Sequence, residues 1–284
     1  MHDIQEFRRY IRRVLSMTQL AERYLDLLTD DKSIKIYQQA FTHPSMNSEV
    51  NYEWLEIMGD ATLNKAIVWY VSRRFPILQN PEGVKVIARL KINMVSKKKF
   101  AEIAETLGMS QFIQVDPEQI QAQNTTMIRS IMEDVLEAFF GATEWILDDR
   151  VEPGAGYGVC YLLLQRILDP LDISLEYNDL YDAITRLKET MDVHRNRWPG
   201  NLRYKPIRDP NYAHDGLQRV QVIYQGPGAN GELLLGDAQG RSLDDAKQAA
   251  AQKAIVYLDK RDIRKNIPSY YLKIREWLRH GSKL

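Results

Sequence analysis

The stretch NYEWLEIMGDATLNKAIVWYVSRRF (51–75) decides the fold of the first part of this chain. Its apolar residues recur at three- and four-residue steps, which predicts one long helix. The same helix carries Glu53, Glu56 and Asp60 at i, i+3 and i+7, so three carboxylates share one face. Gly59 lies among them, where a glycine costs about 1 kcal/mol relative to alanine. The repulsion among the three carboxylates and the cost of the glycine both destabilise the helix, which indicates that this face has a purpose other than helix stability.

A second apolar helix repeats the combination of acids with a glycine. In IMEDVLEAFFGA (131–142), Asp134 and Glu137 are three residues apart on one face, and Gly141 follows one turn later. Carboxylates on a helix otherwise suited to burial are costly unless something pairs with them. Placed beside the acids of the first helix, they would form an all-oxygen site suited to Mg²⁺, with Mn²⁺ as a substitute, and the glycines would be points of close helix approach. Such a site suits metal-assisted phosphodiester hydrolysis, whereas the alternative is that each acid is a solvated surface residue.

Composition describes an ordinary globular protein of 284 residues, with 44% hydrophobic and 27% charged residues. The net charge is zero, so any nucleic-acid partner must be attracted by local patches and not by a global positive field. Cys160 is the single cysteine, which suits a reducing compartment and leads us to expect a cytoplasmic protein. No apolar run approaches the roughly 20 residues that span a bilayer, so we expect no membrane partner.

The chain changes character after residue 170. The first part reads as successive helices, with candidates at 3–28, 33–41, 51–75, 82–94, 96–107, 116–120, 126–149 and 157–168. The second part is expected to run helix, three strands, helix, at 178–192, 202–208, 217–225, 232–238 and 242–260, with a short helix beyond Pro268. The expected fold class is therefore mainly α, an all-helical domain followed by an α-β-β-β-α domain.

Four segments of the first part resemble the ribonuclease III family. NYEWLEIMGDATL resembles the family signature, a run of the type N-E-R-L-E-F-L-G-D-A-V-L, and EDVLEAFFGA resembles its second acidic motif, D-x-x-E-A-x-x-G-A. AFTHPS (40–45) and PEGVKVIARLKINMVS (81–96) resemble the segments that flank the signature. The resemblance covers nearly all of residues 33–170, with the motifs in the family's order.

The resemblance implies roles for eight side chains. Four carboxylates would hold Mg²⁺ and position the attacking water: Glu56, Asp60, Asp134 and Glu137. Glu53 matches an accessory acid of the signature, and Glu82 matches an acid near the cleavage site. Two basic residues would meet phosphate: Arg89 and Lys91. The implied active form is a homodimer in which each subunit cuts one strand of double-stranded RNA, leaving short 3′ overhangs.

Two residues of the signature depart from the family pattern. Ile57 stands where the family usually has the Phe that helps to lock the dimer. Tyr52 stands where the signature usually has Asn before its first acid. The dimer is still expected, with a smaller apolar side chain at its contact.

The second part resembles the double-stranded RNA-binding domain that commonly follows a ribonuclease III domain. The expected division is an endonuclease domain at 1–170, an RNA-binding-like domain at 171–262 and a basic tail at 263–284. The resemblance assigns RNA contacts to three residues: Tyr212, Lys247 and Lys253. However, acids in the segment 243–245 stand where the family has phosphate-binding lysines, and they would repel phosphate. RNA contact therefore competes with a purely structural or dimer-packing role for this domain, and the tail's basic and aromatic residues are a further candidate for RNA contact.

The predicted function is cleavage of double-stranded RNA by a Mg²⁺-dependent homodimer. One alternative is a catalytically silent ribonuclease III-like scaffold that binds RNA, although such relatives have usually lost acids that this chain retains. The other alternative is a protein that sequesters double-stranded RNA, which would require the second domain to dominate.

Overall fold

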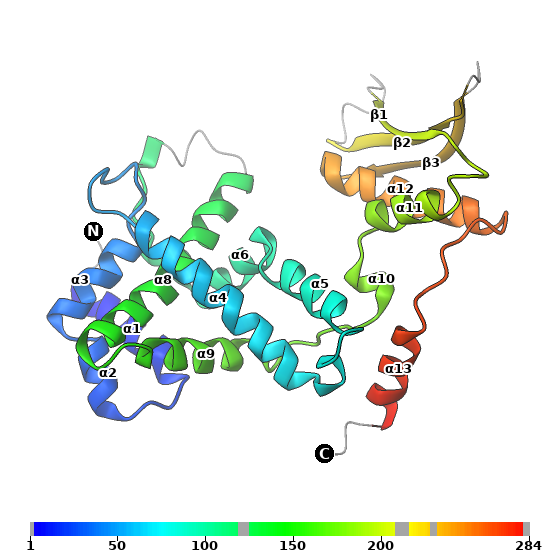
Figure 1. The fold of residues 1–284 in the computed structure, drawn as a ribbon. Coiled ribbons are helices and arrows are strands. Elements are labelled where there is room, and N and C mark those ends of the chain that lie inside the picture. Colours follow the sequence, from blue (N-terminus) through cyan, green and yellow to red (C-terminus); the bar gives the residue numbers. More distant parts are fainter. Residues whose placement is uncertain (1–2, 119–124, 208–215, 228–231, 281–284) are drawn as a thin grey trace. The chain divides into compact units, whose positions relative to one another are not determined.

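The chain folds into two compact units, Met1–Ile173 and Ser174–Leu284 (Figure 1). The computed structural model describes residues 3–118, 125–207, 216–227 and 232–280. Each unit has its own core, and each is treated separately below. The helical first unit and the sheet-containing second unit confirm the predicted fold class.

The first unit consists of helices. They are α1 (Ile4–Ser16), α2 (Glu22–Leu28), α3 (Asp31–Ala40), α4 (Glu53–Arg74), α5 (Val84–Met94), α6 (Lys97–Thr106), α8 (Thr125–Arg150) and α9 (Ala155–Leu168), with 3₁₀ turns η1 (Pro76–Leu78) and η2 (Met109–Phe112). The long helix α8 packs against α3, α4, α6 and α9, so it forms the centre of the unit. In Figure 1, α4 crosses α8, and the two bring the acidic motifs together.

Two glycines allow the backbones of α4 and α8 to touch. A Cβ atom on Gly59 would lie 1.7 Å from the carbonyl oxygen of Glu137, and one on Gly141 would lie 2.0 Å from that of Leu55. Both distances are impossible for a real side chain, so glycine is required on both helices. The predicted close approach is confirmed, and it explains why the long helix at 53–74 tolerates an interior glycine.

Helix α8 is also held at its C-terminal half by α3 and the residue before it. The Tyr37 hydroxyl lies 2.9 Å from Thr143 Oγ1 within the core. Arg150 Nη2 lies 2.6 Å from the carboxylate of Asp30, the N-cap of α3, and this hydrogen bond helps to lower the pKa of Asp30 to about 2. These contacts fix α8 in place along much of its length.

Two predicted helices are wrong in their extent. The helix expected at 3–28 is divided into α1 and α2, because Gln19 adopts a left-handed backbone (φ 58°) that no helix accommodates. The helix expected at 178–192 is divided into α10 (Tyr177–Leu180) and α11 (Ala183–Val193), because Asp182 caps the second one by accepting a hydrogen bond from the Thr185 amide. The short helix expected at 116–120 lies partly outside the described residues.

The second unit is a three-stranded antiparallel sheet with helices on one face (Figure 1). The strands β1 (Asn201–Ile207), β2 (Gln218–Gln225) and β3 (Glu232–Gly240) lie in that order. Helix α12 (Leu243–Asp259) packs on β2 and β3, and α11 packs beside α12. The core includes Leu187 of α11 and Val220 and Val222 of β2, together with the alanines of α12. The predicted order of helix, three strands and helix is therefore correct.

A last helix, α13 (Tyr270–His280), belongs to the second unit and packs on α10. Tyr271 meets Tyr177 edge-on with ring centroids 5.4 Å apart, and the Arg275 guanidinium grips the carboxylate of Glu176, with Nε–Oε2 at 2.8 Å. The short helix predicted beyond Pro268, within the basic tail, is therefore present. None of the helices in the described ranges is long and apolar enough to cross a membrane.

We predict that Gly59→Ala will destabilise the protein, because its methyl group would collide with the backbone of α8. Overpacking of this kind costs about 1–3 kcal/mol. The matched control is Gly158→Ala on α9, where a Cβ meets nothing within 4 Å and the change should stabilise the helix. Thermal unfolding followed by circular dichroism measures both effects, and equal melting temperatures for the two variants would contradict the prediction.

Candidate metal centre

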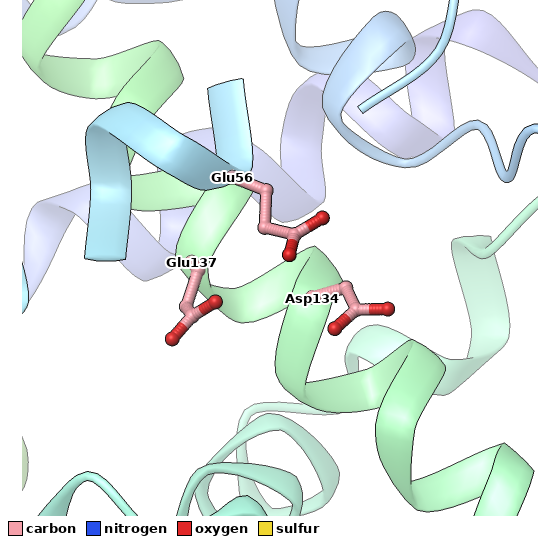
Figure 2. Close-up of side chains that lie close together, drawn as sticks. All are labelled: Glu56, Asp134 and Glu137. Atoms are coloured by element: carbon pink, nitrogen blue, oxygen red, sulfur yellow. The ribbon is translucent and has the colours of Figure 1, made fainter. Parts of the chain in front are cut away.

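Three carboxylates from two helices meet in the first unit (Figure 2). Glu56 comes from the first turns of α4, and Asp134 and Glu137 come from α8. One carboxylate oxygen from each lies within 4.8 Å of the others. Among the described residues, this is the group of acids, histidines and cysteines close enough to hold a metal ion. The sequence predicted all three.

Local hydrogen bonds orient this corner of the site. The Tyr52 hydroxyl, on a buried side chain, donates to Asp134 Oδ2 at 3.0 Å. The amide of Glu53 donates to the side chain of Asn51 at 3.0 Å, which satisfies one of the free amides at the start of α4. Tyr52 and Asn51 therefore fix both the start of the helix and one of the three carboxylates.

Burial and mutual repulsion disfavour the charged forms of these carboxylates. Burial, followed by the charges of Asp134, Glu133 and Glu53, raises the pKa of Glu56 to about 7. Burial, followed by the charges of Asp60 and Glu133, raises the pKa of Glu137 to about 8. Burial also raises the pKa of Asp134, although the Tyr52 hydrogen bond opposes that rise. A divalent cation would relieve this repulsion because it favours the charged form of each acid.

A fourth buried acid and a lysine border the three carboxylates. Glu133 is 7% exposed, and its Oε2 lies 3.1 Å from Nζ of Lys97, at the start of α6. Both residues were missed by the sequence analysis. The spacing of Glu133 and Glu137, four residues apart on one helix, was a usable indication, because it places the two on one face.

The other predicted acids lie outside the group of three. Asp60 is exposed, and its Oδ1 accepts a hydrogen bond from Asn64 Nδ2 at 2.5 Å, although its charge acts on Glu137. Glu53 is exposed in the first turn of α4 and acts on Glu56 through its charge. Glu82 is exposed in the turn before α5, where its amide donates to Asn80.

The predicted RNA-contacting residues are spread over both units. Arg89 and Lys91 are half-buried on α5 of the first unit. Lys247 is half-buried in the first turns of α12, just after a capping box formed by Ser242 and Asp245, and Lys253 is exposed while its Nζ donates to the carbonyl of Asp237 at 2.8 Å. Tyr212 lies outside the described residues. RNA contact by all five stays a prediction.

The donor set fits a hard divalent cation. Its three members offer only carboxylate oxygens, which Mg²⁺ and Mn²⁺ prefer over the nitrogen and sulfur ligands typical of Zn²⁺. His43 is near enough to feel the charges of Asp134 and Glu53, but its Nδ1 is occupied by the amide and hydroxyl of Ser45, and burial lowers its pKa. Glu56, Asp134 and Glu137 could therefore hold a divalent cation, which would supply the chemistry of metal-assisted hydrolysis.

The sequence of this chain is similar to those of known proteins. A family model described as ribonuclease-III-like matches residues 33–145. A protein of Invertebrate iridescent virus 6 with ribonuclease 3 in its name is 33% identical over 94% of this chain and 92% of its own length. A second, from Frog virus 3 (isolate Goorha), is 37% identical over 78% of this chain and 58% of its own length. The ribonuclease 3 of Lactobacillus johnsonii is 30% identical over 78% of this chain and 89% of its own length.

We predict that the metal-free protein loses stability between about pH 4.5 and 8, and that Glu137→Gln removes part of that loss. The ordinary pKa of a glutamate is 4.5, and that of Glu137 is raised to about 8, so the folded state binds a proton that the unfolded state has lost. The stabilising proton is fully present below pH 4.5 and is lost as the pH rises through 8. In EDTA, the melting temperature of Glu137→Gln should therefore exceed that of the wild type by more at pH 8.5 than at pH 5.

Added Mg²⁺ provides the control for this measurement. It should raise the melting temperature of the wild type at pH 8.5 more than that of Glu137→Gln, because binding stabilises the folded state. A constant difference between the two proteins across the pH range would contradict the prediction.

Proposed function

This chain belongs to the ribonuclease III family and is an endoribonuclease, and from that premise we propose that it cleaves double-stranded RNA with Mg²⁺ as its cofactor. The observation that carries the proposal is the meeting of Glu56, Asp134 and Glu137 at the crossing of α4 and α8. Hydrolysis of a phosphodiester needs an activated water and a neutralised phosphate. A divalent cation held by carboxylates can supply both.

The side chains of the site then have distinct roles. Glu56, Asp134 and Glu137 would hold the cation, which supplies activated water and stabilises the leaving oxygen. Tyr52 keeps the Asp134 carboxylate in one orientation through its hydrogen bond, and such supporting contacts commonly matter for metal affinity. Asp60, one turn beyond Glu56, is the fourth carboxylate in the family pattern. Its charge helps to raise the pKa of Glu137.

The active form that we propose is a homodimer, as the resemblance implies. Helix α4 exposes four apolar side chains, Trp54 and Ile57 near its start and Val68 and Trp69 near its end, with Ile57 exposed by 73%. We refer to these four residues as the apolar stripe of α4. Exposed apolar patches of this kind mark interaction surfaces. A second copy of the chain meeting this stripe across a two-fold axis would place two acid clusters in one body, one for each strand of a duplex. Two cuts offset along the duplex would leave the short 3′ overhangs.

We predict that the wild type will cut an end-labelled RNA duplex of a few tens of base pairs in Mg²⁺ but not in EDTA. Glu137→Gln removes one of the three charged ligands, so its cleavage rate should fall by at least about 100-fold. Denaturing gels at single-nucleotide resolution measure the rate and the overhang together. Mn²⁺ should restore activity to the EDTA-treated wild type.

The control variant is Glu118→Gln, an exposed acid outside the cluster, which should cut at the wild-type rate. Equal rates for Glu137→Gln and the wild type would remove the carboxylates from the mechanism. A wild type that retards the duplex on a native gel and never cuts it would replace the proposal with the scaffold or sequestering alternative.

We predict that Ile57→Asp will convert the dimer into monomers, because a charge would be buried within the proposed contact at the most exposed residue of the apolar stripe. Light scattering on the purified protein should show half the mass of the wild type. Val193→Asp, at a residue of α11 exposed by 60%, is the matched control and should leave the mass unchanged. A dimeric Ile57→Asp would show that the stripe is not the contact.

A further inference from the structure

Lys97 is a cation at the rim of the acid cluster. Its Nζ lies 3.1 Å from Glu133 Oε2 and 3.2 Å from Ser130 Oγ, so two residues of α8 hold it. The side chain of Lys97 is 71% exposed, whereas that of Glu133 is 10% exposed. The ammonium group therefore faces solvent on one side and the buried acids on the other.

The position of Lys97 in its own helix is unfavourable. It is the first of three lysines in the first turn of α6, whose N-cap is Ser96, and the start of a helix carries a partial positive charge. Lys99 is paired with Glu102 on the same helix, and Lys98 is exposed. A cation that is placed against the helix dipole, and is held there by a buried acid, departs from local preference, and such departures concentrate at functional sites.

Glu133 is separate from the three carboxylates that meet. Its Oε2 lies 3.1 Å from Nζ of Lys97, whereas the three carboxylates that meet are those of Glu56, Asp134 and Glu137. A buried carboxylate is costly without a partner, and Lys97 is the cation that the structure gives it. The ion pair with Glu133 therefore fixes the position of the Lys97 ammonium group, and we refer to Glu133 as its anchor.

We propose that Lys97 contacts an RNA phosphate at the cleavage site, and that Glu133 is the positioning residue that holds Lys97 there. The inference rests on the proposed function and names a substrate contact within it. A cation-loaded carboxylate site attracts the phosphate to be cut, and a flexible, solvent-facing ammonium at its edge is suited to the backbone oxygens beside it. Lys97 would thus supply a positive charge that remains with the protein when the metal ions leave.

The test compares Lys97→Gln with Lys98→Gln, a neighbouring exposed lysine of the same helical turn. In the full chain, kcat/KM for duplex cleavage should fall by about 10- to 100-fold in Lys97→Gln, the loss of one charge-assisted contact, and stay at the wild-type value in Lys98→Gln. Lys97→Arg should recover most of the loss because it keeps the charge. The Mg²⁺-induced rise in melting temperature should survive in Lys97→Gln, which separates a substrate contact from damage to the metal site.

RNA binding gives a second, independent measure. In a Glu137→Gln background that does not cut, the slope of log affinity against log salt concentration should fall by about 0.9 on adding Lys97→Gln, because one phosphate contact is lost. Lys98→Gln in the same background should leave the slope unchanged. An unchanged slope with Lys97→Gln overturns the proposal.

A double-mutant cycle tests the role of Glu133. If Glu133 acts through Lys97, Glu133→Gln should reduce kcat/KM in the wild type and have no further effect in Lys97→Gln. Additive effects would show that Glu133 acts independently and would overturn its role as the anchor. A wild type that binds the duplex without cutting it would defeat the proposed function, while the salt slope would still decide whether Lys97 meets phosphate.

Discussion

The backbone contact between α4 and α8 is the constraint on which the first unit depends. Two helices that carry ordinary side chains at their crossing lie 8–10 Å apart, whereas Gly59 and Gly141 let a carbonyl of each helix occupy the space of the other's missing Cβ. Because α8 is also held by α3, its orientation cannot relax to accommodate a larger residue. The short separation brings the carboxylate of Glu56 on one helix into range of Asp134 and Glu137 on the other.

Bringing the acids together has an electrostatic cost that the protein only partly offsets. The Tyr52 hydroxyl supports Asp134 and the Lys97 ammonium supports Glu133, yet the pKa values of Glu56 and Glu137 are still raised. Raised pKa values at neighbouring acids mean that burial and mutual repulsion disfavour their charged forms. Such a concentration of charge is characteristic of sites that function with a cation.

Much of this arrangement could be predicted from the sequence, because it follows from helical periodicity. The spacing of acids on one face and the two glycines predicted the helix crossing and a cluster of four carboxylates. Three of them meet, whereas the fourth, Asp60, is exposed and lies outside the group. The breaks at Gln19 and Asp182 could not be found in the same way, since the apolar pattern continues through a left-handed residue and through a cap. Lys97 could not be found either, because its approach to Glu133 depends on how α6 packs against α8.

The basic residues near the C-terminus show why a count of charges misleads about RNA. Within the second unit, Lys265 pairs with Glu189 at 2.7 Å and Arg275 pairs with Glu176, so these cations are engaged inside the fold. The chain as a whole balances 38 basic against 38 acidic residues, and three of its acids meet at the proposed site of RNA cleavage. Under the proposed function, a phosphate can come close only after cations have neutralised that group. Metal loading and RNA binding must then favour one another, because each relieves the repulsion that opposes the other.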